Sequence, residues 1–245
     1  MAEFKLPTET VELPSKGLLY PEGSSLASGT VEMKYMTAKE EDILTNQNYI
    51  TNGTVIDKLL KSMIVTEGVD YNELLSGDKN AIMIAARILA YGKDYEVEIL
   101  GKKNVVDLSL FNPKELEEGL YKRGVNEFHF TLPASQVNIT FKLLTHKDEQ
   151  SIDREIKGLQ KIDNDNITSS TTRLKYITTS VDGSTEKKDI REFIDKYLLA
   201  RDARALRAEY QRVNPDMDLT FYPDGVEEGV DLPIGLTFFW PDAKL

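Results

Sequence analysis

The sequence contains no cysteine among its 245 residues. It therefore has no disulfide framework, no thiol nucleophile and no thiolate metal ligand, and a reducing compartment such as the cytoplasm is the simplest assignment. Histidine is nearly absent as well, with two residues, His129 and His146. Nucleophilic hydrolysis needs a serine or cysteine beside a histidine, yet no Gly-x-Ser-x-Gly elbow occurs. We expect both histidines to be structural or surface residues.

Long hydrophobic runs are also missing. No window approaches the ~20 apolar residues that a membrane-spanning helix requires, and the opening segment MAEFKLPTETVELP lacks the basic and apolar regions of a signal peptide. Positive charge is in deficit, because 30 Lys and Arg face 41 Asp and Glu, which gives a net charge of −11. Such a field repels phosphates, so we expect no broad binding to nucleic acid or to an anionic membrane.

Signatures of nucleotide and metal binding are absent or weak. No P-loop and no Gly-x-Gly-x-x-Gly occurs. Asp163-Asn164-Asp165 and Asp216-Met217-Asp218 each place two carboxylates at i and i+2, but neither continues with the glycine and bidentate glutamate of an EF-hand. We interpret both as solvated loop acids and expect no cofactor and no metal.

With 40% hydrophobic and 29% charged residues, the chain can bury a sizeable core as one large or two modest domains. Its pattern predicts an α+β protein with a largely helical body, a central small antiparallel β region of two hairpins, and an extended N-terminal arm. The predicted regions are the N-terminal arm over 1–28, a helical core region with one strand over 29–93, an antiparallel β insertion over 94–145, and a C-terminal helical region with an aromatic tail over 146–245.

In the core region, apolar residues first alternate with polar ones, as in a strand, and then recur at helical spacing. Its third predicted helix is apolar nearly all round except for Arg87, so we expect it to be the central core helix. The predicted elements are a strand over 29–36 and helices from a Thr37 and Glu40 capping box to about Asn46, over 55–65, and from an Asp78 cap to Tyr91, before Gly92.

In the rest of the chain, apolar residues again alternate with polar ones and then return to helical spacing. Two hairpins are predicted, with a short helical piece from Pro113 between them, and then three helices and a terminal strand pair or extended tail after Pro215. The predicted hairpins are 95–99 with 106–108 around a turn at Gly101–Asn104, and 128–132 with 137–143; the helices carry apolar stripes at Ile152 to Leu159, Leu174 and Ile177, and Ile190 to Leu198.

Three large apolar side chains and two prolines distinguish the N-terminal arm from a free tail. The prolines favour extended backbone, and Gly17 permits a turn. Two interpretations stand level: the arm is an N-terminal strand packed on its own domain, or it docks on a partner. The residues that would contact a partner are Leu13, Pro14, Lys16, Leu18, Leu19 and Tyr20.

Arginine is concentrated in one predicted helix near residue 200. Arg201, Arg204 and Arg207 follow the i, i+3, i+6 spacing that shares one helix face, and Arg212 comes soon after. With few aromatic residues among them, we favour contacts with an acidic protein partner or pairing within the chain over nucleic acid. A structural ion pair is the favoured interpretation for the lone Arg87, with a binding role as the alternative.

The C-terminus holds a dense aromatic segment, Phe238-Phe239-Trp240, with the single tryptophan of the chain. In an extended strand, Phe238 and Trp240 would lie on one face and Phe239 on the other. One face is expected to complete the core while the opposite face meets a neighbour, which makes Phe239 and Trp240 further partner-contact residues.

Several segments resemble the baseplate hub assembly family of T4-like contractile-tailed bacteriophages. They are VELPSKGLLYPEGSSL from Val11, GTVEMKYMTAKEEDIL from Gly29, Gly77-Asp78-Lys79-Asn80 through Arg87 to Gly92, and GLTFFWPDA from Gly235. The resemblance implies a tail-assembly role through contacts with other tail or baseplate proteins, in the host cytoplasm during assembly and, for a hub subunit, in the virion. Some relatives carry paired cysteines that look like a zinc ribbon, and this chain has none.

Within assembly two roles compete: a hub subunit that stays in the virion, and a transient chaperone that leaves before the tail is complete. We expect no enzymatic activity. The alternatives from other classes are a metal-assisted hydrolase using Asp163, Asp165 and His146, which requires those groups to converge, and a nucleic-acid-binding module using the arginine helix.

Overall fold

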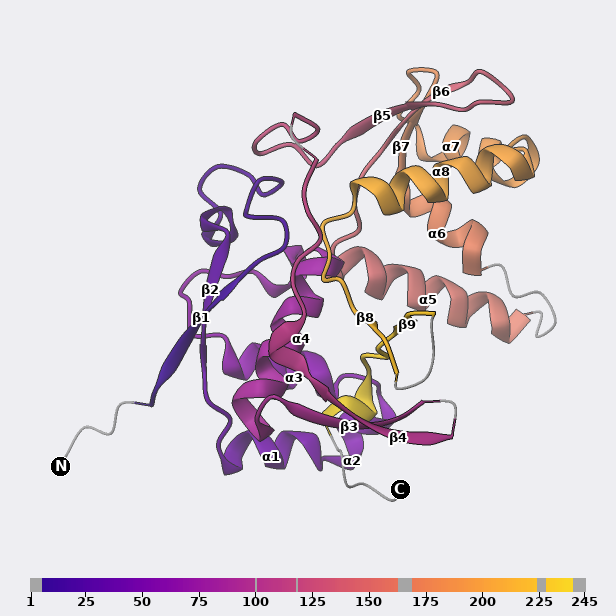
Figure 1. Cartoon of the computed structure of the whole chain (residues 1–245). Helices are drawn as coiled ribbons and strands as arrows, with labels where there is room; N and C mark the ends of the chain where they lie inside the picture. Colours follow the sequence, from indigo (N-terminus) through magenta and orange to yellow (C-terminus); the bar gives the residue numbers. More distant parts are fainter. Residues whose placement is uncertain (1–5, 100, 118, 163–168, 224–227, 240–245) are drawn as a thin grey trace.

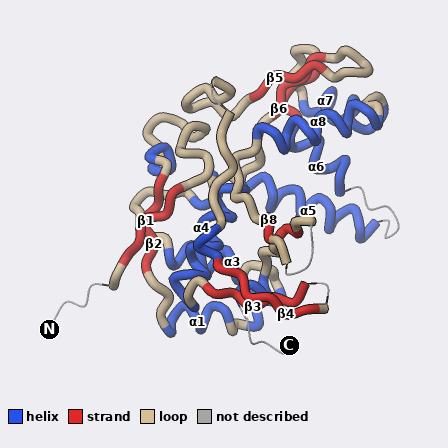
Figure 2. The backbone as a smooth tube through the Cα atoms, viewed as in Figure 1, coloured by secondary structure: helices blue, strands red, loops and turns tan. Residues whose placement is uncertain are grey.

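The computed structural model describes residues 6–99, 101–117, 119–162, 169–223 and 228–239. Within these ranges, helices alternate with small antiparallel sheets of two or three strands, so the predicted α+β class is confirmed. Figure 2 shows how the short strands are distributed among helices and long connecting loops. None of the described helices combines the length and the apolar character needed to cross a membrane.

The N-terminal half contains two antiparallel hairpins and the central helix. β1 pairs with β2, and β3 pairs with β4. The elements are β1 (Thr8–Glu12), η1 (Ser25–Ser28), β2 (Thr30–Lys34), α1 (Ala38–Leu44), α2 (Gln47–Thr51), α3 (Val55–Met63), η2 (Tyr71–Glu73), α4 (Ser76–Tyr91), β3 (Asp94–Ile99), β4 (Lys102–Asp107) and η3 (Leu108–Leu110).

The C-terminal half contains a three-stranded sheet in the order β5-β6-β7 and a short pair, β8 with β9. Two helices, α5 and α6, lie between β6 and β7 in the chain, and two more, α7 and α8, lie between β7 and β8 (Figure 1). The elements are β5 (Phe128–Thr131), β6 (Asn138–Phe141), α5 (His146–Ile162), α6 (Ser169–Ile177), β7 (Thr178–Val181), α7 (Lys187–Lys196), α8 (Ala200–Val213), β8 (Thr220–Phe221), β9 (Val230–Asp231) and η4 (Leu236–Phe239).

The predicted capping box at the start of α1 is present. The Glu40 carboxylate accepts hydrogen bonds from the Thr37 N–H (3.0 Å) and hydroxyl (2.5 Å), and Lys34 Nζ donates to it at 2.8 Å. Burial alone would raise the pKa of Glu40, but these donors outweigh it and lower the pKa to about 2. The carboxylate therefore stays ionised inside the core and fixes where the chain leaves β2.

Helix α4 is the central core helix, as its apolar composition predicts. It buries residues on nearly every side, including Ile82 and Ala86 with no exposed surface. The prediction that Asp78 caps it is wrong, because the helix begins at Ser76 and its N-cap is Leu75. Asp78 lies instead in the first turn and is completely buried.

The predicted 94–145 insertion contains both hairpins, but they belong to separate sheets. Figure 1 shows the β3–β4 hairpin and the β5–β6 hairpin near opposite ends of the molecule. The second hairpin lies at its predicted position, with Phe128 opposite Phe141 and Phe130 opposite Ile139, and β7 adds a third strand that the sequence pattern did not predict. In the first hairpin, Lys102 already lies in β4, so the predicted turn at 101–104 begins correctly and ends too late.

Two further predictions are wrong. Pro113 starts no helix in the described part of 111–127; it forms an isolated antiparallel bridge with Met217. A terminal strand pair is present after Pro215 as predicted, β8 with β9, but the aromatic tail is not part of it. The tail is a 3₁₀ helix, η4, in which Phe238 and Phe239 are both buried, whereas a strand would direct them to opposite faces.

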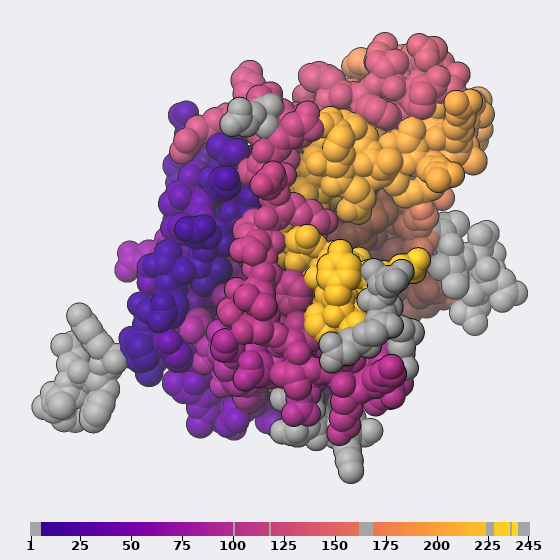
Figure 3. Space-filling view, viewed as in Figure 1, coloured from indigo at the N-terminus to yellow at the C-terminus, as the bar shows by residue number. Residues whose placement is uncertain are grey.

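The buried side chains form one continuous cluster that includes Leu13 near one end of the chain and Phe239 near the other. Figure 3 shows C-terminal residues, in yellow, lying beside magenta residues from the middle of the chain. Segments distant in sequence therefore complete the same core.

Candidate functional site

The N-terminal arm packs on its own chain. Leu13, Leu19 and Tyr20 are 1–3% exposed, and Pro14 is buried as well. This corrects the expectation that these four side chains contact a partner: burying them in the chain's own core removes more apolar surface from water than exposure on an arm would allow. Of the other two predicted contact residues, Lys16 is exposed and Leu18 is half-buried.

A buried carboxylate holds the arm in place. Asp78 accepts hydrogen bonds from the Ser15 N–H (2.9 Å), the Ser15 hydroxyl (2.7 Å) and the Tyr20 hydroxyl (2.6 Å). The same Tyr20 hydroxyl accepts from the Leu75 N–H at 3.0 Å. Burial raises the pKa of Tyr20 far above its ordinary value, and the adjacent carboxylate raises it further, so the phenol remains a donor.

The other residues of this helical turn also contact distant segments of the chain. A Cβ on Gly77 would lie 1.8 Å from the Pro215 carbonyl oxygen, so only glycine permits this approach. Lys79 Nζ donates to Asp57 at 2.8 Å, and the Asn80 side-chain amide donates to Asp216 at 2.9 Å. We call residues 77–80 the α4 turn; it joins the arm, α3 and the segment before β8.

The one buried histidine belongs to a cluster beside the α4 turn. We define the His146 cluster as Asp57, Tyr71, Lys79, His146 and Gln150. His146 Nε2 lies 3.2 Å from Asp57 Oδ2 and 2.9 Å from the Gln150 amide nitrogen, and Lys79 Nζ lies 3.4 Å from Nδ1. The Tyr71 hydroxyl donates to Asp57 Oδ1 at 3.0 Å, and its ring meets the imidazole edge-on at 4.7 Å.

The hydrogen bonds of the cluster favour the ionised form of Asp57. Burial would raise the pKa of Asp57, but hydrogen bonds from His146 and Lys79 outweigh it and hold the pKa well below its ordinary value. Burial, and then the Asp57 charge, raise the pKa of the Tyr71 phenol. The cluster borders a cavity of about 570 Å³. Since both imidazole nitrogens already have partners, its geometry suits a junction between α3, α4 and α5 better than a general base.

The alternative of a metal-assisted hydrolase requires Asp163, Asp165 and His146 to converge. Asp163 and Asp165 lie outside the described residues, and His146 is engaged in its cluster. Among the residues that the structure describes, no three histidine or acidic side chains gather in a way that would hold a metal ion. His129 is exposed on β5, as expected for a surface residue.

Arg87 is buried, but the predicted ion pair is wrong for the described part of the chain. Its Nε donates to the Phe238 carbonyl and its Nη1 to the Gly92 carbonyl, both at 3.1 Å. The rings of Tyr91 and Tyr95 lie 5.0 and 5.6 Å from the guanidinium carbon. Burial lowers the pKa of Arg87, and carbonyl dipoles and ring faces supply the compensation that a carboxylate would otherwise give.

The aromatic tail is attached through the same arginine. Phe238 and Phe239 have no exposed surface, and the Phe238 ring packs edge-on against Tyr95 with centroids 4.9 Å apart. Phe239 is therefore a core residue, which corrects its assignment as a partner contact. Trp240, the other predicted contact of the tail, lies outside the described residues.

Helix α8 presents the predicted arginine face. Arg201, Arg204 and Arg207 are exposed and form no ion pair with any other described residue. The opposite face buries Leu206 and Asp202. We call the three arginines the α8 arginine face; Arg212 is not part of it, because it pairs with Glu209 and Glu117.

The buried side of α8 fixes its orientation. Asp202 accepts hydrogen bonds from the N–H groups of Ala134 (2.8 Å) and Ser135 (3.0 Å) in the β5–β6 loop. Burial would raise the pKa of Asp202, but these two donors outweigh it and lower the pKa. The α8 arginine face therefore points outward because Asp202, one residue after Arg201, is hydrogen-bonded to the β5–β6 loop on the opposite side of the helix.

Sequence reasoning found the α8 arginine face but missed the α4 turn and the His146 cluster. The visible signal was Gly77-Asp78-Lys79-Asn80 at the start of an apolar helix, since polar residues at the buried end of a core helix need partners. The chain matches no protein-family model, no curated protein and no solved structure.

Proposed function

We propose that this chain is a non-enzymatic protein of a contractile phage tail, which acts in assembly of the baseplate hub through contacts with other tail or baseplate proteins. The proposal begins from the resemblance at the N-terminal arm, at residues 29–44, at the α4 turn through Gly92, and at the aromatic tail.

One observation carries the proposal: the segments that hold the resemblance contact one another. The arm meets the α4 turn through Asp78, and η4 meets the same helix through Arg87. The arm also pairs with the segment from Gly29, where Val11 lies opposite Val31 and the Leu13 N–H donates to the Gly29 carbonyl at 2.9 Å. Short motifs that match by chance would have no reason to be connected by buried hydrogen bonds, so this connection supports a shared fold.

The α8 arginine face supplies the contact surface. Three exposed guanidinium groups on a chain of net charge −11 favour an acidic segment of a partner protein, since arginine pairs with carboxylates in bidentate geometry. The buried Asp202 holds this face rigidly. With the arm and Phe239 packed on their own core, α8 is the predicted contact element that the described structure leaves free for a partner.

Quantitative mass spectrometry of purified phage particles tests the proposal, with known tail proteins as copy-number standards. A hub subunit is expected at a fixed, symmetry-compatible copy number. A transient chaperone, the alternative role, is expected in infected-cell lysate and not in particles, with defective baseplates when the gene is inactivated. Normal tails in the absence of the protein would contradict both roles.

The triple variant Arg201→Glu, Arg204→Glu, Arg207→Glu tests the surface in the same assay. Tail assembly is expected to fall at least about tenfold, because each reversed charge removes an attraction and adds a repulsion of about 1 kcal/mol or more. The thermal midpoint of the isolated protein should hardly change. Reversal of three other exposed cations, Lys102, Lys103 and Lys122, is the matched control. An equal loss in the control would show that only total charge matters.

A further inference from the structure

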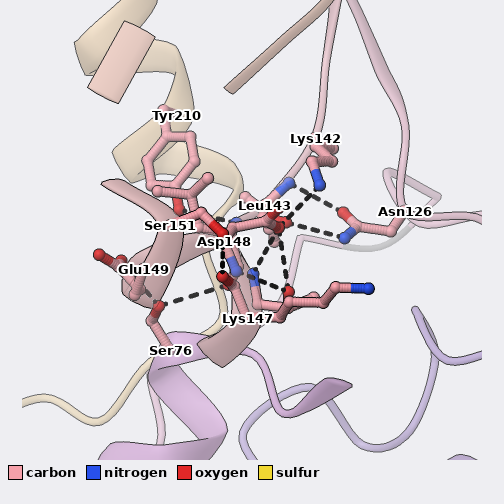
Figure 4. Close-up of polar contacts among 11 residues, drawn as sticks. Ser76, Asn126, Lys142, Leu143, Lys147, Asp148, Glu149, Ser151 and Tyr210 are labelled. Carbon is pink, nitrogen blue, oxygen red and sulfur yellow. Dashed lines mark hydrogen bonds and ion pairs between the residues drawn. The ribbon is translucent and has the colours of Figure 1, made fainter. Parts of the chain in front are cut away.

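A basic cavity lies between α5, α7 and the end of α6, although the chain as a whole is acidic. Its volume is about 420 Å³. Figure 4 shows part of its wall, where Lys142, Lys147 and Ser151 surround Asp148 in the first turn of α5. The cations that line the cavity are Lys142, Lys147, Lys175, Lys187 and Arg191, and Asp148 is the one carboxylate among its described lining residues.

Three of the five cations have carboxylate partners. Lys142 Nζ lies 2.7 Å from Asp148, Lys175 Nζ lies 2.7 Å from Asp195, and Arg191 contacts both oxygens of Glu155 at 2.7 and 2.8 Å. These pairs hold the wall in place. Lys147 and Lys187 form no ion pair with any described residue, so two positive charges face the cavity without compensation.

The pair that shapes this wall also begins α5. Asp148 accepts from the Thr145 N–H (3.1 Å) and hydroxyl (3.0 Å) as well as from Lys142. Thr145 and Asp148 thus cap the helix. All three donors bind Asp148 Oδ2, and the Lys142 ammonium compensates the charge of this carboxylate.

Hydroxyl groups in the cavity wall are bonded or shielded. Those of Tyr176 and Thr179 are bonded to Glu155 and Thr140. Thr178 is 4% exposed; its Oγ1 makes no hydrogen bond in the described part of the chain, but the oxygen itself has almost no accessible surface. The donors that a ligand can reach are therefore the unpaired lysines.

We infer that this cavity binds the phosphate group of a small molecule. A phosphate dianion matches the two uncompensated lysines, and its oxygens accept from ammonium and hydroxyl donors alike. A volume of about 420 Å³ is in the range of small-molecule sites and is larger than a free phosphate ion requires, so a small phosphate monoester fits better. Nucleic acid is disfavoured by the surrounding net charge of −11.

Isothermal titration calorimetry and thermal unfolding of the full chain test this site. The probes are inorganic phosphate, glycerol 3-phosphate and a nucleoside 5′-monophosphate, each compared with sodium chloride at equal ionic strength. Binding and a rise in the thermal midpoint are expected for phosphate monoesters above inorganic phosphate. The order of affinities distinguishes a site for the free ion from a site for a monoester.

The double variant Lys147→Gln, Lys187→Gln should weaken binding at least about tenfold, since each lysine donates a charge-assisted hydrogen bond. Both side chains are exposed and unpaired among the described residues, so the fold should be unaffected. Lys102→Gln with Lys122→Gln is the control of equal charge. No binding of any probe, or equal binding by wild type and the Lys147 and Lys187 variant, would overturn the inference.

Discussion

Asp57 is the central residue of the His146 cluster, since its carboxylate pairs with a lysine, a histidine and a tyrosine. Its folded pKa is below its ordinary value because the hydrogen bonds from His146 and Lys79 outweigh the burial that would raise it. The unfolded carboxyl titrates near about pH 4. The stabilisation from Asp57 is therefore complete above about pH 4 and is lost as the pH falls toward the folded pKa.

Asp57→Asn should lower the unfolding free energy at pH 7 by about 1.5–3 kcal/mol, the cost of losing charge-assisted hydrogen bonds. The gap between variant and wild type should begin to narrow below about pH 4, where the unfolded carboxyl becomes neutral, and should keep shrinking as the pH falls toward the folded pKa. Urea unfolding from pH 7 to pH 2 measures both. Asp153→Asn, on the exposed part of α5 beside the same cavity, is the control and should remain parallel to wild type. A constant gap for Asp57→Asn would contradict the assignment.

Single residues also show where sequence reasoning ended. The burial of Arg87 on an apolar helix was predictable, but its partners were not, because the Phe238 carbonyl is 151 residues away in sequence. Asp78 resembled a helix cap because aspartate before an apolar run usually is one. Its true partner, Ser15, is 63 residues away, and no local pattern encodes that distance.

At the scale of elements, the helices with a clear apolar stripe were predictable. The stripes in α3, α5 and α7 are local properties of the chain, and each of these helices formed close to its predicted position. β7 was not predictable, because its four residues TTSV follow α6 directly and become a strand only by pairing with β6. η4 escaped prediction for a similar reason, since Arg87 and Tyr95 determine its conformation.

The start of α4 gives a sharp prediction about glycine in helices. Gly77→Ala should destabilise the protein by about 3 kcal/mol or more, because the new methyl group meets the Pro215 carbonyl and the backbone must move. Gly158→Ala in α5 has no atom within 4 Å and should stabilise by about 0.5–1 kcal/mol. Chemical denaturation of both variants measures the contrast. Equal effects would mean that the close approach at Gly77 does not exist in solution.

At the scale of the whole molecule, the α4 turn predicts that distant segments open together. Amides of Leu13 to Tyr20 should exchange with solvent through the same opening as those of α4, since Asp78 and the core connect them. Hydrogen exchange followed by mass spectrometry measures both segments. Asp78→Ala should release residues 13–20 first. If the wild-type arm exchanges much faster than α4, it detaches in solution, and docking of the arm on a partner becomes the better interpretation.

The α4 turn also has a consequence for how the protein is synthesised. Its residues bind Ser15, Asp57 and Asp216, and the last of these leaves the ribosome long after the helix itself. In a nascent chain that ends before Pro215, the first turns of α4 lack their contact with Asp216. Contacts between residues so far apart in sequence form slowly. The ribosome-bound chain is therefore expected to remain partly open until Pro215 and Asp216 have left the ribosome, which is the interval in which chaperones would act on it.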